Sequence, residues 1–246
     1  MISPAEQIRI AACGDTALTV EFGNRIDRNL TMRVVAFGNC VSAARIEGVV
    51  EVVPTYRSLL VHYDPLTISC SSLEAQIRQM LGRAAPAAAG GRSWTIPACY
   101  EGPAAPDLDD VARRTGLTPE EVVSVHSEEP YFVYMLGFLP GFPYLGDLPA
   151  ALELTRRDSP RTRVPAGSVA IALRMTGVYP LESPGGWHLI AKTPIRFFDH
   201  RRKTDPSLLR AGDTVRFAPV SYRDFETLSR DVGAGNFELK PDGGSP

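Results

Sequence analysis

The spacing of apolar residues over the first third of the chain predicts strands and helices in mixed order. Alternation in Ala17–Phe22 and two runs rich in β-branched residues, Val49–Val53 and Leu59–Tyr63, predict three strands. Apolar residues recur at helical spacing after Asp27 and again after Ser71, which predicts two helices with an N-cap and a capping box at those positions. The order β-α-β-β-α is most of a ferredoxin-like fold.

A small-residue segment then separates two regions of different pattern. Arg83–Arg92 is rich in Ala, Gly and Pro, which predicts a linker at about 83–93 between a domain over 1–88 and a second over 89–235. Trp94–Ala98 is expected to supply the missing last strand of the ferredoxin-like sheet and so to tie the domains together. Residues 236–246 are expected to form a frayed tail.

The second domain reads as a helix pair followed by many short strands. Leu108–Thr115 and Pro119–His126 are the predicted helices, and Thr118 caps the second one. That helix carries Glu120 and Glu121 and no lysine or arginine, so it is not expected to bind DNA. Frequent Gly and Pro signals separate five further strands, predicted at 132–136, 168–173, 187–191, 195–198 and 214–217. The pattern favours a closed or nearly closed β-barrel, and the fold class is α+β, mainly β.

The loop within Tyr131–Asp147 carries large apolar side chains on a rigid backbone. Pro140 and Gly141 bend the chain sharply, and Phe142 and Tyr144 follow directly. Such a loop fits the wall of a pocket or a partner surface. The alternative is an Ω-like loop packed by its own side chains.

Two further loops carry candidate chemistry. Arg161 and Arg163 are spaced to project from one side of an extended segment, which suits capture of a carboxylate or phosphate, and the amides of Gly167 and Ser168 are candidate oxyanion donors. The alternative is a strand-entry turn with surface arginines. In the other loop, Ser-Pro-Gly-Gly precedes Trp187, which is either a stacking wall or a core residue.

Complete catalytic motifs are missing from the sequence. It contains neither a Walker A motif, so no P-loop ATP site is expected, nor a G-x-S-x-G elbow. His126 is a candidate general base, because it lies at a helix end just before the strand that leads into the apolar loop. The alternative is that it only caps the end of the helix.

Composition narrows the class of protein. The net charge of −2 argues against nucleic-acid binding, and no apolar stretch approaches the ~18 residues that span a bilayer. The four cysteines are widely spaced, which argues against a metal site and against a disulfide framework. A reduced, cytoplasmic protein without metal or prosthetic group is expected.

Several long motifs closely resemble the 5-oxoprolinase B-subunit family, also called the KipI-like or allophanate hydrolase subunit 1 family. They are PDLDDVARRTGLTPEEVVSVHS, YFVYMLGFLPGFPYLGDLP, RTRVPAGSVAIA and TGVYPLESPGGW, and the match extends over most of residues 95–220. The resemblance implies a cyclophilin-like β-barrel behind a small α/β domain. It also implies a KipA-like protein as partner, with a LamB/YcsF-like protein as the third component that completes ATP-dependent opening of 5-oxoproline to glutamate.

The resemblance and the loops together give the candidate site residues. The catalytic candidates are His126, Arg163 and Ser168. The substrate-binding candidates are Pro140, Gly141, Phe142, Tyr144, Pro165, Ala166, Gly167, Thr176, Tyr179, Ser183, Gly185, Gly186 and Trp187. ATP is expected as a co-substrate of the complex.

One segment departs from the family pattern. Where the family usually reads Gly-Gly-Gln, this chain has Leu173, Arg174 and Met175. Losing an amide that binds substrate typically costs ~1–3 kcal/mol, so specificity is expected to differ, or the chain binds without catalysing.

Three functions therefore stay open. The leading one is the B-subunit of an ATP-dependent 5-oxoprolinase, inactive alone. The second is a component of an allophanate hydrolase or urea carboxylase type of carboxyltransferase. The third is a KipI-like inhibitor of a sensor histidine kinase.

Overall fold

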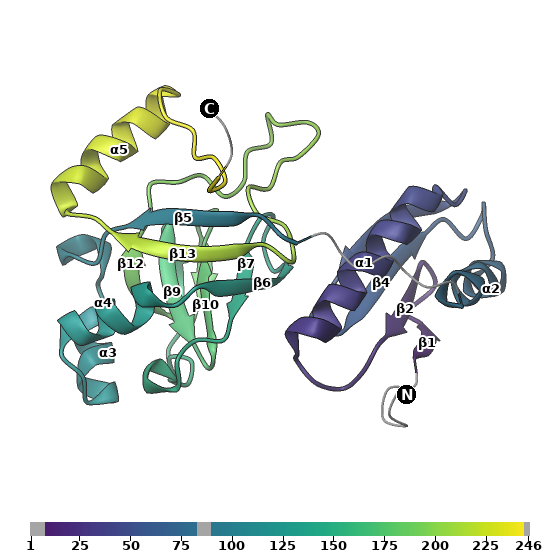
Figure 1. The fold of residues 1–246 in the computed structure, drawn as a ribbon, viewed down its shortest axis with the longest axis horizontal. Helices are drawn as coiled ribbons and strands as arrows, with labels where there is room; N and C mark the ends of the chain where they lie inside the picture. The colour runs from purple at the N-terminus through teal and green to yellow at the C-terminus, as the bar shows by residue number, and fades with distance from the viewer. Residues whose placement is uncertain (1–7, 83–89, 244–246) are drawn as a thin grey trace. The chain divides into compact units, whose positions relative to one another are not determined.

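The computed structural model describes residues 8–82 and 90–243. It divides the chain into two compact units, Met1–Gly90 and Gly91–Pro246, and each is described by itself (Figure 1). Most of the predicted linker lies outside the described residues.

The first unit is a four-stranded antiparallel sheet with two helices. Its strands lie in the order β1-β2-β4-β3. In chain order the elements are β1 (Arg9–Ala12), β2 (Ala17–Glu21), α1 (Arg28–Ala44), β3 (Val49–Pro54), β4 (Ser58–Tyr63) and α2 (Cys70–Leu81). The apolar faces of the helices and strands share one core, which confirms the predicted periodicity.

The fourth strand of this sheet is not the predicted one. β1 pairs antiparallel with β2, with Ile10 opposite Val20, and occupies the edge that the last strand of a ferredoxin-like fold would fill. Trp94–Ala98 instead belongs to the second unit, so its assignment to this sheet was wrong. A short turn brings β1 onto β2, and local pairing of this kind requires little loop closure.

The helix starts were predicted with mixed success. The Asp27 carboxylate accepts a hydrogen bond from the Leu30 amide at 3.0 Å, which confirms that cap. The capping box at Ser71 was wrong, because Ser69 caps α2 through the Ser72 amide at 3.2 Å. Serines at 69, 71 and 72 offer similar cap residues, and the sequence alone does not choose among them.

The second unit is built around a seven-stranded sheet in the order β12-β9-β10-β7-β6-β13-β5. Its helices are α3 (Leu108–Thr115), α4 (Pro119–Glu128) and α5 (Tyr222–Ala234), with 3₁₀ turns at Gly102–Ala104 and Ala150–Leu152. Its strands are β5 (Ser93–Ala98), β6 (Tyr131–Leu136), β7 (Pro143–Gly146), β8 (Arg161–Val164), β9 (Ser168–Ala172), β10 (Met175–Val178), β11 (Ser183–Gly185), β12 (His188–Lys192) and β13 (Thr214–Pro219).

The sheet curls into a nearly closed barrel. Its two edge strands meet where Cys99, just after β5, exchanges backbone hydrogen bonds of 2.8 and 2.9 Å with Lys192 of β12. The inward residues of the strands form the main core, which includes Val133, Leu145 and Ile171. This confirms the α+β class and the nearly closed barrel.

The helices pack on the barrel and add residues such as Val111, Val122 and Val232 to this core. Figure 1 shows α3 and α4 together at one end and α5 beyond the β5–β13 edge. The capping box at Thr118 is confirmed, since its hydroxyl accepts from the Glu121 amide and the Glu121 carboxylate accepts from the Thr118 amide. No helix among the described residues is long and apolar enough to cross a membrane.

Two predictions for the end of the chain were wrong. Residues 195–198 form no strand, although Phe197 still packs into the core. The expected frayed tail is ordered through residue 243: Phe237 and Leu239 pack against the core, and the Asp242 amide donates to the Ser93 carbonyl at 2.8 Å. Helix α5, which the pattern did not reveal, brings this segment back to β5.

Candidate functional site

Five aromatic side chains form a cluster on the outer face of the barrel, over β7, β9, β10 and β12. We call it the aromatic cluster, and its members are Phe138, Phe142, Tyr144, Tyr179 and Trp187. Phe142 is its centre, with ring centroids 5.1 to 5.7 Å from those of the other four. The rings meet edge to face, which is the favoured geometry for aromatic pairs.

The strands beneath the aromatic cluster carry small residues. Ala170 and Ala172 of β9 face it, and Gly177 of β10 lies directly under Phe142. A Cβ atom at Gly177 would lie 3.0 Å from Cζ of Phe142 and 2.9 Å from the Pro143 carbonyl. The small side chains therefore leave the space that the aromatic rings fill.

The apolar loop has one buried and one exposed aromatic side chain. Phe142 is only 2% exposed, whereas Phe138 is 62% exposed. The loop is held by backbone bonds from Gly137 to the Phe142 carbonyl and from Phe142 to the Leu139 carbonyl. Phe138 and Gly141 both have positive φ, +69° and +77°, and a bulky residue in this region is uncommon. The strained backbone holds Phe138 outward while Phe142 anchors the loop.

Close packing and hydrogen bonds hold the Ser-Pro-Gly-Gly segment in place. A Cβ atom at Gly185 would lie 2.3 Å from the Tyr179 hydroxyl, and the Gly186 carbonyl accepts from the Arg157 amide at 2.8 Å. Ser183 is buried, and its hydroxyl donates to the Pro184 carbonyl. Trp187 is 7% exposed and packs into the aromatic cluster, outside the barrel interior.

The two phenols of the aromatic cluster stay protonated at neutral pH. Burial raises the pKa of Tyr179, while the nearby Arg156 guanidinium and the Trp187 amide oppose that rise. Burial also raises the pKa of Tyr144, again against the charge of Arg156. Neutral phenols can donate hydrogen bonds to a ligand but are poor bases. Arg156 is exposed and forms no ion pair within the described residues.

His126 lies inside the barrel, away from the aromatic cluster. It is fully buried, with Nδ1 2.7 Å from the Tyr100 hydroxyl and Nε2 2.9 Å from the Thr176 hydroxyl. Because the Thr176 hydroxyl donates to the Ala170 carbonyl, it accepts from Nε2–H, and Nδ1 then accepts from Tyr100. Its ring also stacks on Phe217 with centroids 4.9 Å apart.

This environment contradicts the expected catalytic role of His126. Burial lowers its pKa to about 3, so the ring is neutral, and a solute in water does not reach it. Thr176 is 0% exposed and lies in the same interior pair, so the structure does not place it among substrate-binding residues either.

The two arginines of β8 do not act together. Arg161 donates to Asp107 at 2.6 Å, whereas Arg163 is exposed and pairs with Glu182 at 2.7 Å. Each guanidinium already has a carboxylate partner, so the predicted joint anion site is not formed by this pair.

The Pro-Ala-Gly-Ser turn is likewise closed on itself. The Gly167 amide donates to the Tyr179 carbonyl at 2.7 Å and the Ser168 amide to the Pro165 carbonyl at 3.3 Å. Neither amide is available as an oxyanion donor. Pro165 and Ala166 are exposed at the tip of the turn, as is Pro140 in the apolar loop.

Lys192 is a candidate residue that sequence reasoning missed. It lies opposite Ser168 across β12 and β9, beside the Leu189–Ala170 pair that faces the aromatic cluster. Side chains in such a cross-strand pair are about 5 Å apart at Cβ. Within the described residues, neither side chain forms a hydrogen bond or ion pair. Nothing in the local sequence marks Lys192, since only the register joins it to Ser168.

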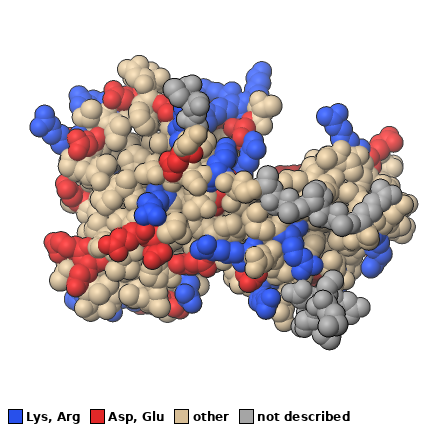
Figure 2. All heavy atoms as spheres, in the orientation of Figure 1, with Lys and Arg blue, Asp and Glu red and all other residues tan. Residues whose placement is uncertain are grey.

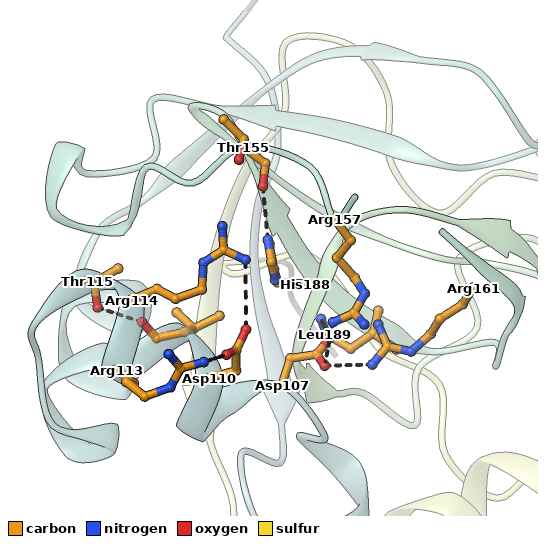
Figure 3. A network of polar contacts seen from close by, with 11 residues as sticks. Asp107, Asp110, Arg113, Arg114, Thr115, Thr155, Arg157, Arg161, His188 and Leu189 are labelled. Atoms are coloured by element: carbon orange, nitrogen blue, oxygen red, sulfur yellow. Dashed lines mark hydrogen bonds and ion pairs between the residues drawn. The ribbon is translucent and has the colours of Figure 1, made fainter. Parts of the chain in front are cut away.

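A polar network centred on Asp107, at the start of α3, links α3 to β8, β12 and the segment before β8 (Figure 3). The Asp107 carboxylate is 4% exposed and accepts from Arg157, Arg161 and the Leu189 amide, at 3.3, 2.6 and 2.7 Å. Figure 3 also shows His188, whose Nε2 donates to the Thr155 carbonyl at 2.9 Å. The network fixes the segment that carries Arg156 against β12. No group of three or more metal-ligating side chains occurs in residues 8–82 and 90–243.

Comparison with known proteins agrees with this architecture. The family model described as carboxyltransferase domain, subdomain C and D, matches residues 8–209. The B-subunit of 5-oxoprolinase from Bacillus subtilis (strain 168) is 40% identical over 235 residues, covering 91% of this chain and 97% of that protein. The chain belongs to the 5-oxoprolinase B-subunit family.

Solved structures give the same picture of the fold. The crystal structure of TTHA0988 is 38% identical with a TM-score of 0.74, and the match covers 87% of this chain and 40% of that one. The Kluyveromyces lactis urea amidolyase has a TM-score of 0.79 at 21% identity, covering 97% of this chain and 16% of that one. At that identity the likeness concerns the fold alone, and the chain spans less than half of either structure.

Proposed function

We propose that this chain is the B-subunit of an ATP-dependent 5-oxoprolinase, and that its aromatic cluster with Ser168 and Lys192 forms one wall of a composite site. The single observation that carries the proposal is the full-length similarity to a 5-oxoprolinase B-subunit. The catalytic groups on this chain are too few for the reaction alone, which agrees with a site completed by a KipA-like protein. A LamB/YcsF-like protein would complete the enzyme.

The wall offers chemistry that suits 5-oxoproline, a small lactam with one carboxylate. The ammonium group of Lys192 and the guanidinium of Arg156 are cations that no carboxylate of the described residues neutralises. One of them would bind the substrate carboxylate, and the aromatic cluster would pack against the lactam ring. ATP would enter as co-substrate without a P-loop in this chain.

The exposed apolar residues around the cluster support contact with a partner. Phe138 is 62% and Leu181 40% exposed, and Leu181 follows Tyr179 by two residues. Phe138 lies in the apolar loop and Leu181 in the segment between β10 and β11, and exposed apolar residues of this kind favour an interaction surface. We assign this surface to the KipA-like protein.

Reconstitution tests the proposal directly. The chain, the KipA-like protein and the LamB/YcsF-like protein of the same organism are purified, and glutamate formation from 5-oxoproline and ATP is measured for each alone and for all combinations. Turnover only in the full mixture is the expected result. Turnover by this chain alone, or none in the full mixture, contradicts it.

Two alternatives stay distinguishable in the same experiment. The carboxyltransferase alternative rests on the family model, and it predicts stable binding to the KipA-like protein without 5-oxoproline turnover. The alternative of a sensor histidine kinase inhibitor rests on Met175, which replaces the usual Gln and packs against the aromatic cluster. It predicts no binding to the KipA-like protein and inhibition of kinase autophosphorylation.

A further inference from the structure

A second candidate ligand site lies apart from the aromatic cluster, where the end of the chain returns to the barrel. A pocket of about 250 Å³ opens between the segment after β12, the C-terminal end of α5 and residues 235–239. Its floor is apolar and continuous with the main core, through Ile195, Leu208 and Val232. Phe237 and Leu239 form the side that the C-terminal segment supplies.

The polar rim of the pocket carries an excess of positive charge. Three arginines and two carboxylates line it. Arg201 pairs with Asp199, and that hydrogen-bonded contact holds the pKa of the Asp199 carboxyl well below its usual range. Arg202 pairs with Glu238 across the opening. Arg196 is the third arginine; it is exposed and forms no ion pair within the described residues. Figure 2 shows Lys and Arg gathered over the segment between β12 and β13.

Backbone hydrogen bonds hold the walls in place before any ligand binds. Leu208 donates to the Phe197 carbonyl at 2.9 Å, and Asp199 donates to the Pro206 carbonyl at 2.8 Å, so the loop between them is closed at its base. The other wall begins where the Asn236 amide donates to the Asp231 carbonyl at 2.8 Å after α5. A preformed apolar pocket with a few placed polar groups is the usual form of a small-molecule site.

We propose that this pocket binds a small amphipathic monoanion, with its apolar body between the floor at Ile195 and the side formed by Phe237 and Leu239, and its carboxylate on Arg196. The guanidinium group matches a carboxylate in planar, two-pronged geometry, and Arg196 is the arginine of the rim that forms no ion pair, although its charge also acts on the nearby Asp199. Three arginines against two carboxylates leave one positive charge in excess, which fits one negative charge. The site is independent of the composite site proposed above, although the backbone of Phe197, which follows Arg196, lies against Gly141 of the apolar loop.

The probe that tests this is hexanoate, with neutral hexanamide as its uncharged counterpart. Binding to the full chain is measured by isothermal titration calorimetry for the wild type, Arg196→Gln and Arg223→Gln. Arg223 is a matched control, because it is an exposed arginine of α5 without an ion pair in the described part of the chain and lies outside the pocket. Both substitutions are at the surface, so folding is retained, and melting curves verify this.

The expected result is one hexanoate site per chain, with binding weakened at least tenfold for hexanamide and for Arg196→Gln and unchanged for Arg223→Gln. Equal affinity for hexanoate and hexanamide would overturn the role of the charge. Equal weakening by both substitutions would show a nonspecific electrostatic effect and overturn the site. An absence of hexanoate binding would overturn the proposal altogether. None of these results depends on 5-oxoprolinase activity.

Discussion

Nε2 of His126 lies 2.9 Å from the Thr176 hydroxyl, at the centre of a hydrogen-bonded chain that runs from Tyr100 to the Ala170 carbonyl. These hydrogen bonds join α4 to β10 through the barrel interior, and every polar side-chain atom in the series has a hydrogen-bond partner. A buried network of this kind fixes the packing of a core, since losing one partner leaves the others unpaired.

His126 gives the protein a defined loss of stability in acid. Its pKa is about 3 in the folded state and 6.5 when solvent-exposed, so the unfolded state binds more protons between these values. The contribution of neutral His126 is therefore full above pH 6.5 and is lost as pH falls toward 3, by up to about 1.4 kcal/mol per pH unit.

Urea unfolding at pH 7.5, 6.0 and 5.0 measures this effect. His126→Gln is expected to lower stability at pH 7.5 yet to show a flatter dependence on pH, whereas His200→Gln, at an exposed position, follows the wild type. Parallel pH profiles for wild type and His126→Gln would mean that the histidine is not buried in its neutral form.

Phe138 and Phe142 are expected to separate function from folding. Phe138→Ala removes a ring that is 62% exposed and should leave the melting temperature nearly unchanged while it weakens partner binding or turnover of the assembled complex. Phe142→Ala removes the centre of the aromatic cluster and should cost about 3–5 kcal/mol of stability. Calorimetry and the reconstituted assay together give both readouts. Full activity of Phe138→Ala would remove this loop from the interface.

Leu173 is expected to be a site of local strain. Its φ is +53°, in the left-handed region, and its side chain is 50% exposed. This conformation costs a leucine about 1–2 kcal/mol, and a glycine would avoid that cost. Glycine has more freedom in the unfolded chain, however, and this freedom reduces the gain in stability from the substitution. Leu173→Gly should therefore stabilise the protein by about 0.5 kcal/mol.

The neighbouring residue supplies the control for that measurement. Arg174 is also exposed but is not among the residues with positive φ, so Arg174→Gly should destabilise by about 0.5–1 kcal/mol. Chemical denaturation measures the free energy of unfolding of both variants against the wild type. A loss of stability in Leu173→Gly as large as that in Arg174→Gly would show that the leucine side chain contributes more than its backbone costs.

Lys192 is expected to matter for turnover and not for folding. Its ammonium group has no carboxylate partner in the described chain, so Lys192→Met should change the melting temperature little. If Lys192 binds the substrate carboxylate, the reconstituted complex should lose about tenfold or more in kcat/KM, mainly through KM. Lys203→Met, at an exposed position outside the aromatic cluster, is the matched control. Equal activities of the two variants would exclude this role.

The sequence was a good guide wherever a signal is local. Periodicity predicted α1, α2, α3 and α4 and most strands, because an amphipathic face repeats within a few residues of itself. Thr118 with Glu121 predicted its cap for the same reason. The family resemblance, carried by long motifs, led to the correct family and to the barrel.

Tertiary structure decided the features that depend on partners distant in the chain. β5 pairs with β13 instead of joining the sheet of the first unit, and pairing register alone brought Lys192 opposite Ser168. Burial turned His126 from a candidate base into a core residue, and it closed the Gly167 and Ser168 amides with partners of their own. The local sequence of a residue determines which groups it can offer, but only the packed chain determines which of them remain free for a ligand.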